Sequence, residues 1–173
     1  MNSLITGSAL FPNFISNTDN LYNRLLSLNY DKSMSSRWTT SFGRSYDYSG
    51  MTYPDTQIPD FLADLIPEIS DLVGFIPNNC LINLYHDSNS SMGYHSDNTD
   101  ILVPGTGVVI ISIGFPRILR FRNIEDRTNI VDYVLESGSL FYMNDIIQSE
   151  WMHSIPRMDA DSGRISLTFR NIV

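Results

Sequence analysis

The stretch RISLTFR, residues 164–170, indicates how the end of this chain folds. Its polar residues stand at even positions and its apolar residues at odd ones. Because side chains alternate between the two faces of a β-strand, this pattern predicts a strand with one polar and one apolar face. An arginine at each end of the polar face, Arg164 and Arg170, suits a small dicarboxylate, which guanidinium groups bind through paired hydrogen bonds. A straight strand would separate the two by about 20 Å, so both reach one ligand only if the strand curves and their side chains converge.

Short segments rich in β-branched and aromatic residues recur from residue 79 onward, punctuated by Gly, Pro, Asn and Asp. We predict strands over residues 80–85, 108–113, 117–122, 130–135, 139–143 and 164–171. Many short strands without intervening helices favour a sandwich or jelly roll. Upstream, helical spacing predicts helices over 17–28 and 59–73, with Pro67 kinking or splitting the second. Residues 33–58 have the composition of a loop or hairpin.

The composition limits both the domain count and the partners. A chain of 173 residues with 42% hydrophobic residues is expected to form one domain, 1–173, with one core. The net charge of −8 argues against avid binding to long duplexes, although local charge can still favour a nucleic acid. A single cysteine, Cys80, excludes an intramolecular disulfide and fits a reducing, cytoplasmic location. We find no signal peptide and no apolar span of ~20 residues, and expect no membrane association.

A candidate metal site is formed by His95, Asp97 and His153. His95 and Asp97 are two residues apart, so on a strand both would face one ion, and His153 would join them from a neighbouring strand. Two histidines and one carboxylate on one face of Fe(II) leave its other positions open for a cosubstrate and O2. The alternative is a loop histidine beside a capping aspartate, because Asp is common in this chain.

An ordered set of motifs resembles the AlkB family of Fe(II)- and 2-oxoglutarate-dependent dioxygenases. The motifs are Arg37–Gly43 and Tyr46–Gly50 in the family's substrate-lid region, Asn83-Leu-Tyr85, His95-Ser-Asp97, Ser112-Ile-Gly114 with Arg117 and Phe121-Arg122, Leu135–Gly138, Trp151–Pro156 and Arg164–Arg170. The resemblance implies a mostly β fold with flanking helices. Its core would be a double-stranded β-helix (jelly roll) over 79–173, with N-terminal helices and a substrate lid in 1–78.

The resemblance also implies roles for single residues. Arg164 would bind the distal carboxylate of 2-oxoglutarate and Arg170 would act near the metal-bound end. Further cosubstrate contacts would come from Asn83, Tyr85 and Ser166, the last standing where the family usually has Asn. Candidate substrate residues are the aromatic side chains that could stack on a base and one arginine that could contact a base or phosphate: Trp38, Tyr46, Tyr48 and Arg117.

The implied activity is oxidative demethylation of N-alkylated bases, of the 1-methyladenine and 3-methylcytosine type, in single-stranded DNA or RNA. The enzyme would be a monomer that uses Fe(II) as its cofactor and consumes 2-oxoglutarate and O2. It would release formaldehyde, succinate and CO2. An AlkB-type oxygenase acting on a protein or small molecule is the alternative, because Asn98-Thr99-Asp100 moves or removes an acidic group that reads the base in some family members. A third possibility is a non-catalytic metal-binding jelly roll, against which the paired arginines argue.

Overall fold

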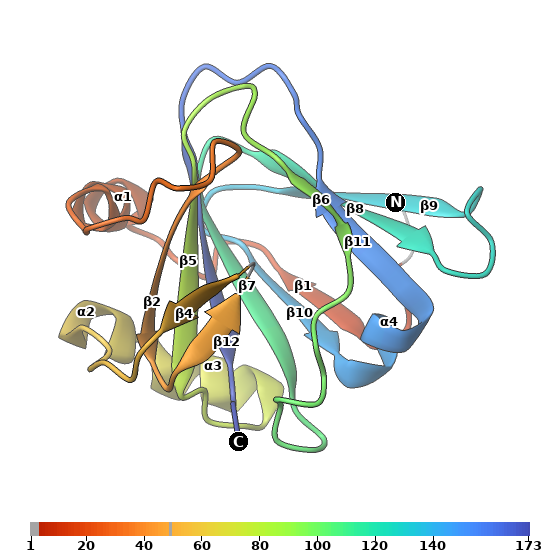
Figure 1. The fold of residues 1–173 in the computed structure, drawn as a ribbon, viewed down its shortest axis with the longest axis horizontal. Coiled ribbons are helices and arrows are strands. Elements are labelled where there is room, and N and C mark those ends of the chain that lie inside the picture. Colours follow the sequence, from red (N-terminus) through yellow and green to blue (C-terminus); the bar gives the residue numbers. More distant parts are fainter. Residues whose placement is uncertain (1–3, 49) are drawn as a thin grey trace.

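Two antiparallel sheets dominate the computed structural model, which describes residues 4–48 and 50–173 (Figure 1). The larger sheet has six strands, in the order β1 (Ser8–Phe11), β10 (Leu140–Asn144), β7 (Gly107–Gly114), β12 (Arg164–Arg170), β5 (Asn79–Tyr85) and β2 (Trp38–Gly43). The smaller sheet has four, in the order β6 (Met92–His95), β11 (Trp151–Ile155), β8 (Arg117–Asn123) and β9 (Ile130–Leu135). All six strands predicted from the sequence are therefore confirmed.

The two sheets face each other across a shared apolar core, which makes the fold a jelly roll, as predicted. Val108 and Phe141 of the larger sheet belong to one buried cluster with Phe121 and Trp151 of the smaller sheet. Phe121 packs against Phe141 with ring centroids 5.8 Å apart. The space between the sheets is thus apolar at this end, and the polar site described below occupies another part of it.

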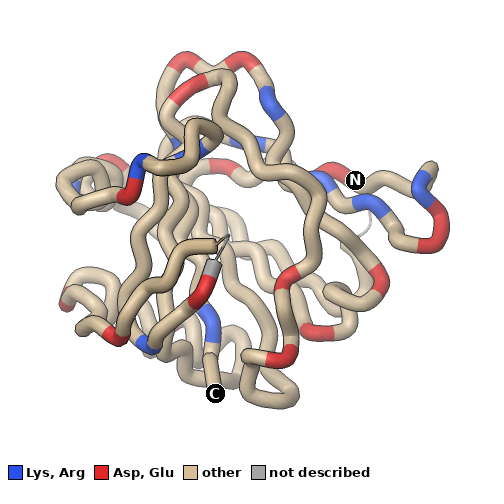
Figure 2. Tube along the Cα trace, in the orientation of Figure 1, with Lys and Arg blue, Asp and Glu red and all other residues tan. Residues whose placement is uncertain are grey.

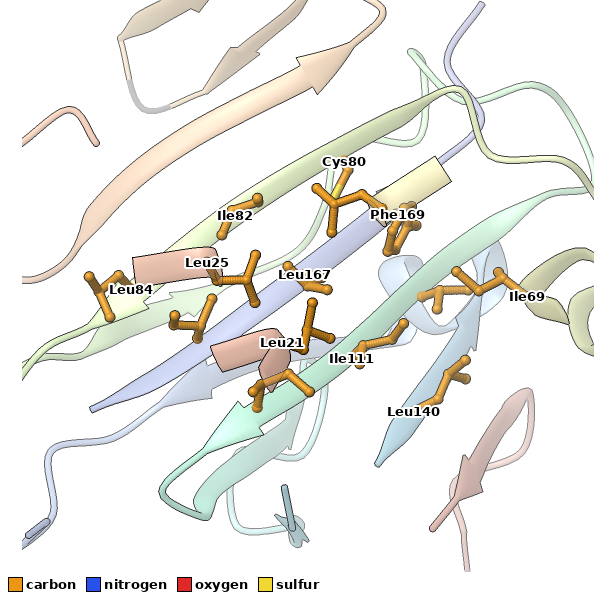
Figure 3. Packing of buried hydrophobic residues seen from close by; sticks show 14 of the residues in the cluster. Leu21, Leu25, Ile69, Cys80, Ile82, Leu84, Ile111, Leu140, Leu167 and Phe169 are labelled. Carbon is orange, nitrogen blue, oxygen red and sulfur yellow. The ribbon is translucent and has the colours of Figure 1, made fainter. Parts of the chain in front are cut away.

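Three helices cover the outer face of the larger sheet: α1 (Thr18–Leu26), α2 (Asp60–Ala63) and α3 (Ile66–Val73). Figure 3 shows Leu21 and Leu25 of α1 in the same cluster as Ile82 and Leu167 of the sheet. Helix α1 begins where predicted, because Asn17 caps it by accepting a hydrogen bond from a backbone N–H of the first turn. The second predicted helix is split into α2 and α3, with Pro67 in the first turn of α3, where a missing N–H costs nothing.

Strand β12 lies in the middle of the larger sheet, between β7 and β5, and both of its faces are buried. Ile165, Leu167 and Phe169 point to the helix-covered face and are fully buried. The polar residues of the same strand point into the space between the sheets, where they line a pocket. The predicted alternation of RISLTFR is confirmed, and the polar face is turned to the interior.

Sequence reasoning missed several elements. Residues 33–58 contain the predicted hairpin, formed by β3 (Tyr46–Tyr48) and β4 (Met51–Tyr53), but also β2, an edge strand of the larger sheet. Gly43 ends β2 at a φ of 86°, and a Cβ there would collide with the Asn78 carbonyl. Strands β1, β6 and β11 and helix α4 (Asp145–Glu150) were not assigned, because each is short. In the described residues, no helix is long and apolar enough to cross a membrane.

Candidate active site

The three predicted metal ligands come together at one edge of the smaller sheet. His95 ends β6 and lies opposite His153 of β11 in the antiparallel ladder, and Asp97 follows in the loop after β6. One ligand atom from each of the three side chains lies within 4.8 Å of the other two. The cross-strand pairing explains this meeting, because directly opposed residues on one face of a sheet are close neighbours.

The orientation of His95 and the burial of His153 suit metal binding. Nδ1 of His95 lies 3.0 Å from the Gly93 carbonyl, which can only accept, so Nδ1 donates there and Nε2 is the ring atom left to face a metal ion. That Nε2 lies 3.8 Å from Oδ1 of Asp97. Burial lowers the pKa of His153 to about 4, so its ring is neutral at pH 7. Its Nδ1 is buried and has no hydrogen-bond partner within the described part of the chain.

Asp97 supplies the charge that a divalent cation needs. Its side chain is 5% exposed, and Nη2 of Arg170 donates to Oδ1 at 3.1 Å. Burial by itself would raise the pKa of Asp97, but Arg170, then His153 and His95, hold it below its ordinary value. An ionised carboxylate beside two imidazoles fits a divalent iron ion with open positions.

The buried His153 predicts a pH-dependent stability for the metal-free protein. Unfolding returns this histidine to an ordinary pKa of 6.5, so between pH 6.5 and about 4 the unfolded state binds the extra proton. The free energy of unfolding should therefore fall as the pH falls through this window, by roughly 3 kcal/mol at most. Urea unfolding from pH 7 to 4.5 checks this. His153→Asn should flatten the slope, and an equal slope in both proteins would contradict the assignment.

A small pocket extends from the metal ligands between the two sheets. It is lined by Leu81, Asn83, Tyr85, Met92, His95, Asp97, Ile110, Leu119, His153, Ile155, Arg164, Ser166, Thr168 and Arg170. All of the residues predicted to bind the cosubstrate are in this set. The two arginines of β12 therefore do reach one cavity, and Arg170 does so beside Asp97.

Arg164 is a buried cation in the same pocket, and none of the carboxylates that the structure describes is its partner. It is 1% exposed, and its Nε and Nη2 donate to the Ser112 hydroxyl at 3.2 and 2.7 Å. Its Cζ lies 5.1 Å from the centroid of the Tyr85 ring. Among residues 4–48 and 50–173 no carboxylate pairs with Arg164, and its Nη1 lacks a hydrogen-bond partner. Burial lowers its pKa, which means that the cation is disfavoured until an anion arrives. A carboxylate of the cosubstrate fits this need.

Asn83 is positioned by a residue that the sequence did not single out. Its Oδ1 accepts a hydrogen bond from Nε of Arg37, which is only 6% exposed, at 3.1 Å. Arg37 also donates to the Ser91 carbonyl at 3.2 Å. It thus joins β5 to the turn before β6. In the sequence Arg37 is notable only as part of the lid motif, and within that motif the neighbouring Trp38 was chosen as the candidate site residue.

The lid residues occupy different places. Tyr46 of β3 is 6% exposed, and the Arg170 guanidinium carbon lies 5.0 Å from its ring centroid. Tyr46 also lines a second hollow, together with Ser45, Asp47, Asn98, Ile101 and Ile172. Because Asn98 directly follows Asp97, this hollow adjoins the metal ligands. The side chain of Tyr48 lies outside the described residues.

Trp38 is not in either hollow, which corrects the stacking role expected for it. It pairs with Leu84, one position away from the Thr39–Asn83 pair, and therefore points to the helix-covered face of the larger sheet. Its ring stacks on His86 at 4.6 Å, and Lys32 lies over it at 4.2 Å. A change of one position along a strand moves a side chain to the opposite face.

Arg117 does not face a substrate either, contrary to the predicted contact with a base or phosphate. It is fully buried, and its guanidinium donates to the backbone carbonyls of Asp87 and Ser90. These contacts hold the turn between β5 and β6, the strands that carry Asn83 and His95. The spacing of the arginines on β8 does not predict these contacts, because the atoms that accept from Arg117 are backbone carbonyls about thirty residues upstream.

Taken together, the fold and the site define a jelly-roll protein with a two-histidine, one-carboxylate metal site beside an anion-binding pocket. The sequence model of the 2OG-Fe(II) oxygenase superfamily matches residues 9–170. The chain is 34% identical over 140 residues to the human "DNA oxidative demethylase ALKBH2", covering 76% of this chain and 53% of that protein. It is 29% identical over 147 residues to the cattle "Alpha-ketoglutarate-dependent dioxygenase alkB homolog 3", covering 79% and 51%. The chain belongs to the 2OG-Fe(II) oxygenase superfamily and, within it, to the AlkB-like proteins.

The comparison of structures agrees with this assignment at the level of the fold. The solved structure of OsALKBH1 matches with a TM-score of 0.72 and 18% identity, covering 98% of this chain and all of that one. Membership of the superfamily implies Fe(II), 2-oxoglutarate and O2 as cofactor and cosubstrates, which the His95–Asp97–His153 group fits. The chain spans about half the length of the curated relatives named above.

Proposed function

We propose that this chain is an Fe(II)- and 2-oxoglutarate-dependent dioxygenase that demethylates N-alkylated bases, of the 1-methyladenine and 3-methylcytosine type, in single-stranded DNA or RNA. One observation carries the proposal: the three clustered ligands share a pocket with Arg164, a buried cation without a carboxylate partner among the described residues. A metal site alone would not need that cation, whereas a dicarboxylate cosubstrate does. The similarity to proteins named as demethylases, a DNA oxidative demethylase among them, favours a nucleic acid over other substrates.

The residues divide the work in this proposal. Bound iron, 2-oxoglutarate and O2 supply the oxidation of a C–H bond. His95, His153 and Asp97 hold the metal, while Arg170 keeps Asp97 ionised and fixed in position. Arg164 and Tyr85 bind the distal carboxylate, and Asn83 and Ser166 lie along the cosubstrate.

Apolar walls keep water away from the reacting groups. Leu81, Ile110 and Leu119 line the pocket and are at most 6% exposed. Low local polarity strengthens the contacts of Arg164 and Arg170 with anions. An N-methyl group that is hydroxylated here becomes an N-hydroxymethyl group, which loses formaldehyde and restores the base.

The hollow beside the metal ligands is the proposed position of the base. Tyr46 offers an aromatic wall, and an alkylated base must leave its stack to reach such a site. Tyr48 remains a proposed second stacking residue. Figure 2 shows acidic positions spread through the loops with basic positions interspersed, which suits a short single-stranded segment better than a long duplex. We further propose that the chain acts as a single-domain monomer in a reducing, cytoplasmic compartment, which the buried Cys80 thiol supports.

Turnover of methylated oligonucleotides tests the function. The protein, loaded anaerobically with Fe(II) and 2-oxoglutarate, is exposed to air with oligonucleotides that each carry one methylated base, as DNA and as RNA. We expect succinate, formaldehyde and the loss of one methylene mass from at least one oligonucleotide in the mass spectrum. Succinate with every oligonucleotide unchanged would redirect the search to protein or small-molecule substrates, and the absence of succinate would refute the dioxygenase.

A further inference from the structure

Asp97, the carboxylate of the proposed metal site, lies just beyond the end of β6, where no strand that the structure describes pairs with the chain. The ladder between β6 and β11 ends at the His95–His153 pair, and Asp97 lies two residues beyond it. Two contacts from the segment 148–151 replace the missing ladder. The Asp97 backbone N–H donates to Oε1 of Gln148 at 2.7 Å, and the Ser96 hydroxyl donates to the Trp151 carbonyl at 3.0 Å.

The Gln148 side chain is itself held in one orientation. It is 5% exposed and belongs to α4. This helix is capped by Asn144, whose side chain accepts the Ile147 N–H at 3.2 Å, and Ile147 is fully buried. Because the Asp97 N–H can only donate, the amide oxygen of Gln148 must be the atom that faces it.

The other end of the same amide is unusual. Nε2 of Gln148 is buried and makes no hydrogen bond to any residue that the structure describes. An unpaired buried N–H is unfavourable, and an apolar side chain of the same length would avoid it. The amide is therefore poorly explained by packing, and its bond to Asp97 is the contact that an apolar residue could not make.

We propose that Gln148 is a positioning residue for the metal site, which fixes the Asp97 main chain so that its carboxylate points at the ion. The inference rests on the proposed metal site. Without this bond the Asp97 peptide can rotate away from His95 and His153, because the turn has no ladder partner. Partners that orient a metal ligand typically change metal affinity by 10- to 100-fold when removed, and we expect a loss in this range.

Binding of Co(II), a stand-in for Fe(II) that is stable in air, tests the proposal by isothermal titration calorimetry on the full chain. Gln148→Met keeps the length of the side chain but removes the acceptor, and should weaken Co(II) binding by roughly 10- to 100-fold. Gln148→Glu keeps an oxygen acceptor and should restore affinity to within about threefold of the parent. Gln148→Asn is polar but too short to reach Asp97, so its Co(II) affinity should be as low as that of Gln148→Met. It replaces Gln148→Met in the test if that variant does not fold.

Ser149→Ala is the matched control. Its hydroxyl lies on the same helix and donates to the Ile146 carbonyl at 2.8 Å, away from the ligands, so its Co(II) affinity should equal that of the parent. Thermal unfolding of each metal-free variant separates a positioning role from a structural one. Folded Gln148→Met or Gln148→Asn that binds Co(II) within twofold of the parent would overturn the proposal, even if its melting temperature falls. A parent that binds no Co(II) would instead refute the metal site itself.

Discussion

Replacing Asp97 by alanine is expected to lower succinate formation by more than ~100-fold, because removing a direct ligand should cost more than removing a group that only orients one. Two histidines would remain, but the charge that offsets a divalent ion would be gone. Arg170 would also lose the carboxylate to which its Nη2 donates at 3.1 Å. The measurement is succinate release per enzyme at saturating 2-oxoglutarate, together with Co(II) affinity.

Asp97→Ala could fail through unfolding, since breaking a buried ion pair costs roughly 3–5 kcal/mol. Asp97→Asn keeps the side-chain volume and should show the same loss of metal affinity with a smaller loss of stability. Asp71→Ala removes an exposed carboxylate on α3, outside the pocket, and should leave both properties unchanged. Folded Asp97 variants with parental turnover would show that the ion, if bound, is held elsewhere.

The fold could be predicted from sequence largely because its longer strands are rich in β-branched and aromatic residues and are separated by Gly, Pro, Asn and Asp. RISLTFR also alternates clearly, since its three apolar residues sit under the helices and its polar residues line the pocket. Helix boundaries followed from local chemistry at Asn17 and Pro67. The four-residue β1 and β6 carry too few positions for a period to appear.

Some residues of the site could likewise be predicted from the sequence, and others could not. Its metal ligands follow a spacing that the sequence displays, and the structure brings them together. The stacking role predicted for Trp38 was wrong because the direction of its side chain depends on pairing with Leu84 across the sheet. Arg117 and Gln148 act through backbone atoms 27 to 51 residues away in sequence, and no local pattern encodes such contacts.

The second large effect is expected at Arg164, and it has two parts of opposite sign. Arg164→Met should weaken binding of 2-oxoglutarate to the Co(II)-loaded protein by ~100-fold, which corresponds to the loss of about 3 kcal/mol from charge-assisted hydrogen bonds. The same change should raise the free energy of unfolding of the metal-free protein by roughly 1 to 3 kcal/mol, because an apolar side chain replaces a buried cation that lacks a carboxylate partner in the described residues. Calorimetry and urea unfolding measure the two parts.

This pair of results distinguishes a binding group from a structural one. If Arg164 were a structural residue, its removal would lower both the affinity for 2-oxoglutarate and the free energy of unfolding. A cation kept for an anionic ligand instead lowers the stability of the protein until that ligand binds. Arg164→Lys keeps the charge without the paired geometry and should bind 2-oxoglutarate with intermediate affinity. Arg157→Met, at an exposed position, should change neither quantity. If Arg164→Met lost stability and kept its affinity for 2-oxoglutarate, the distal carboxylate would have to bind elsewhere, and the pocket would lose the observation that marks it as a cosubstrate site.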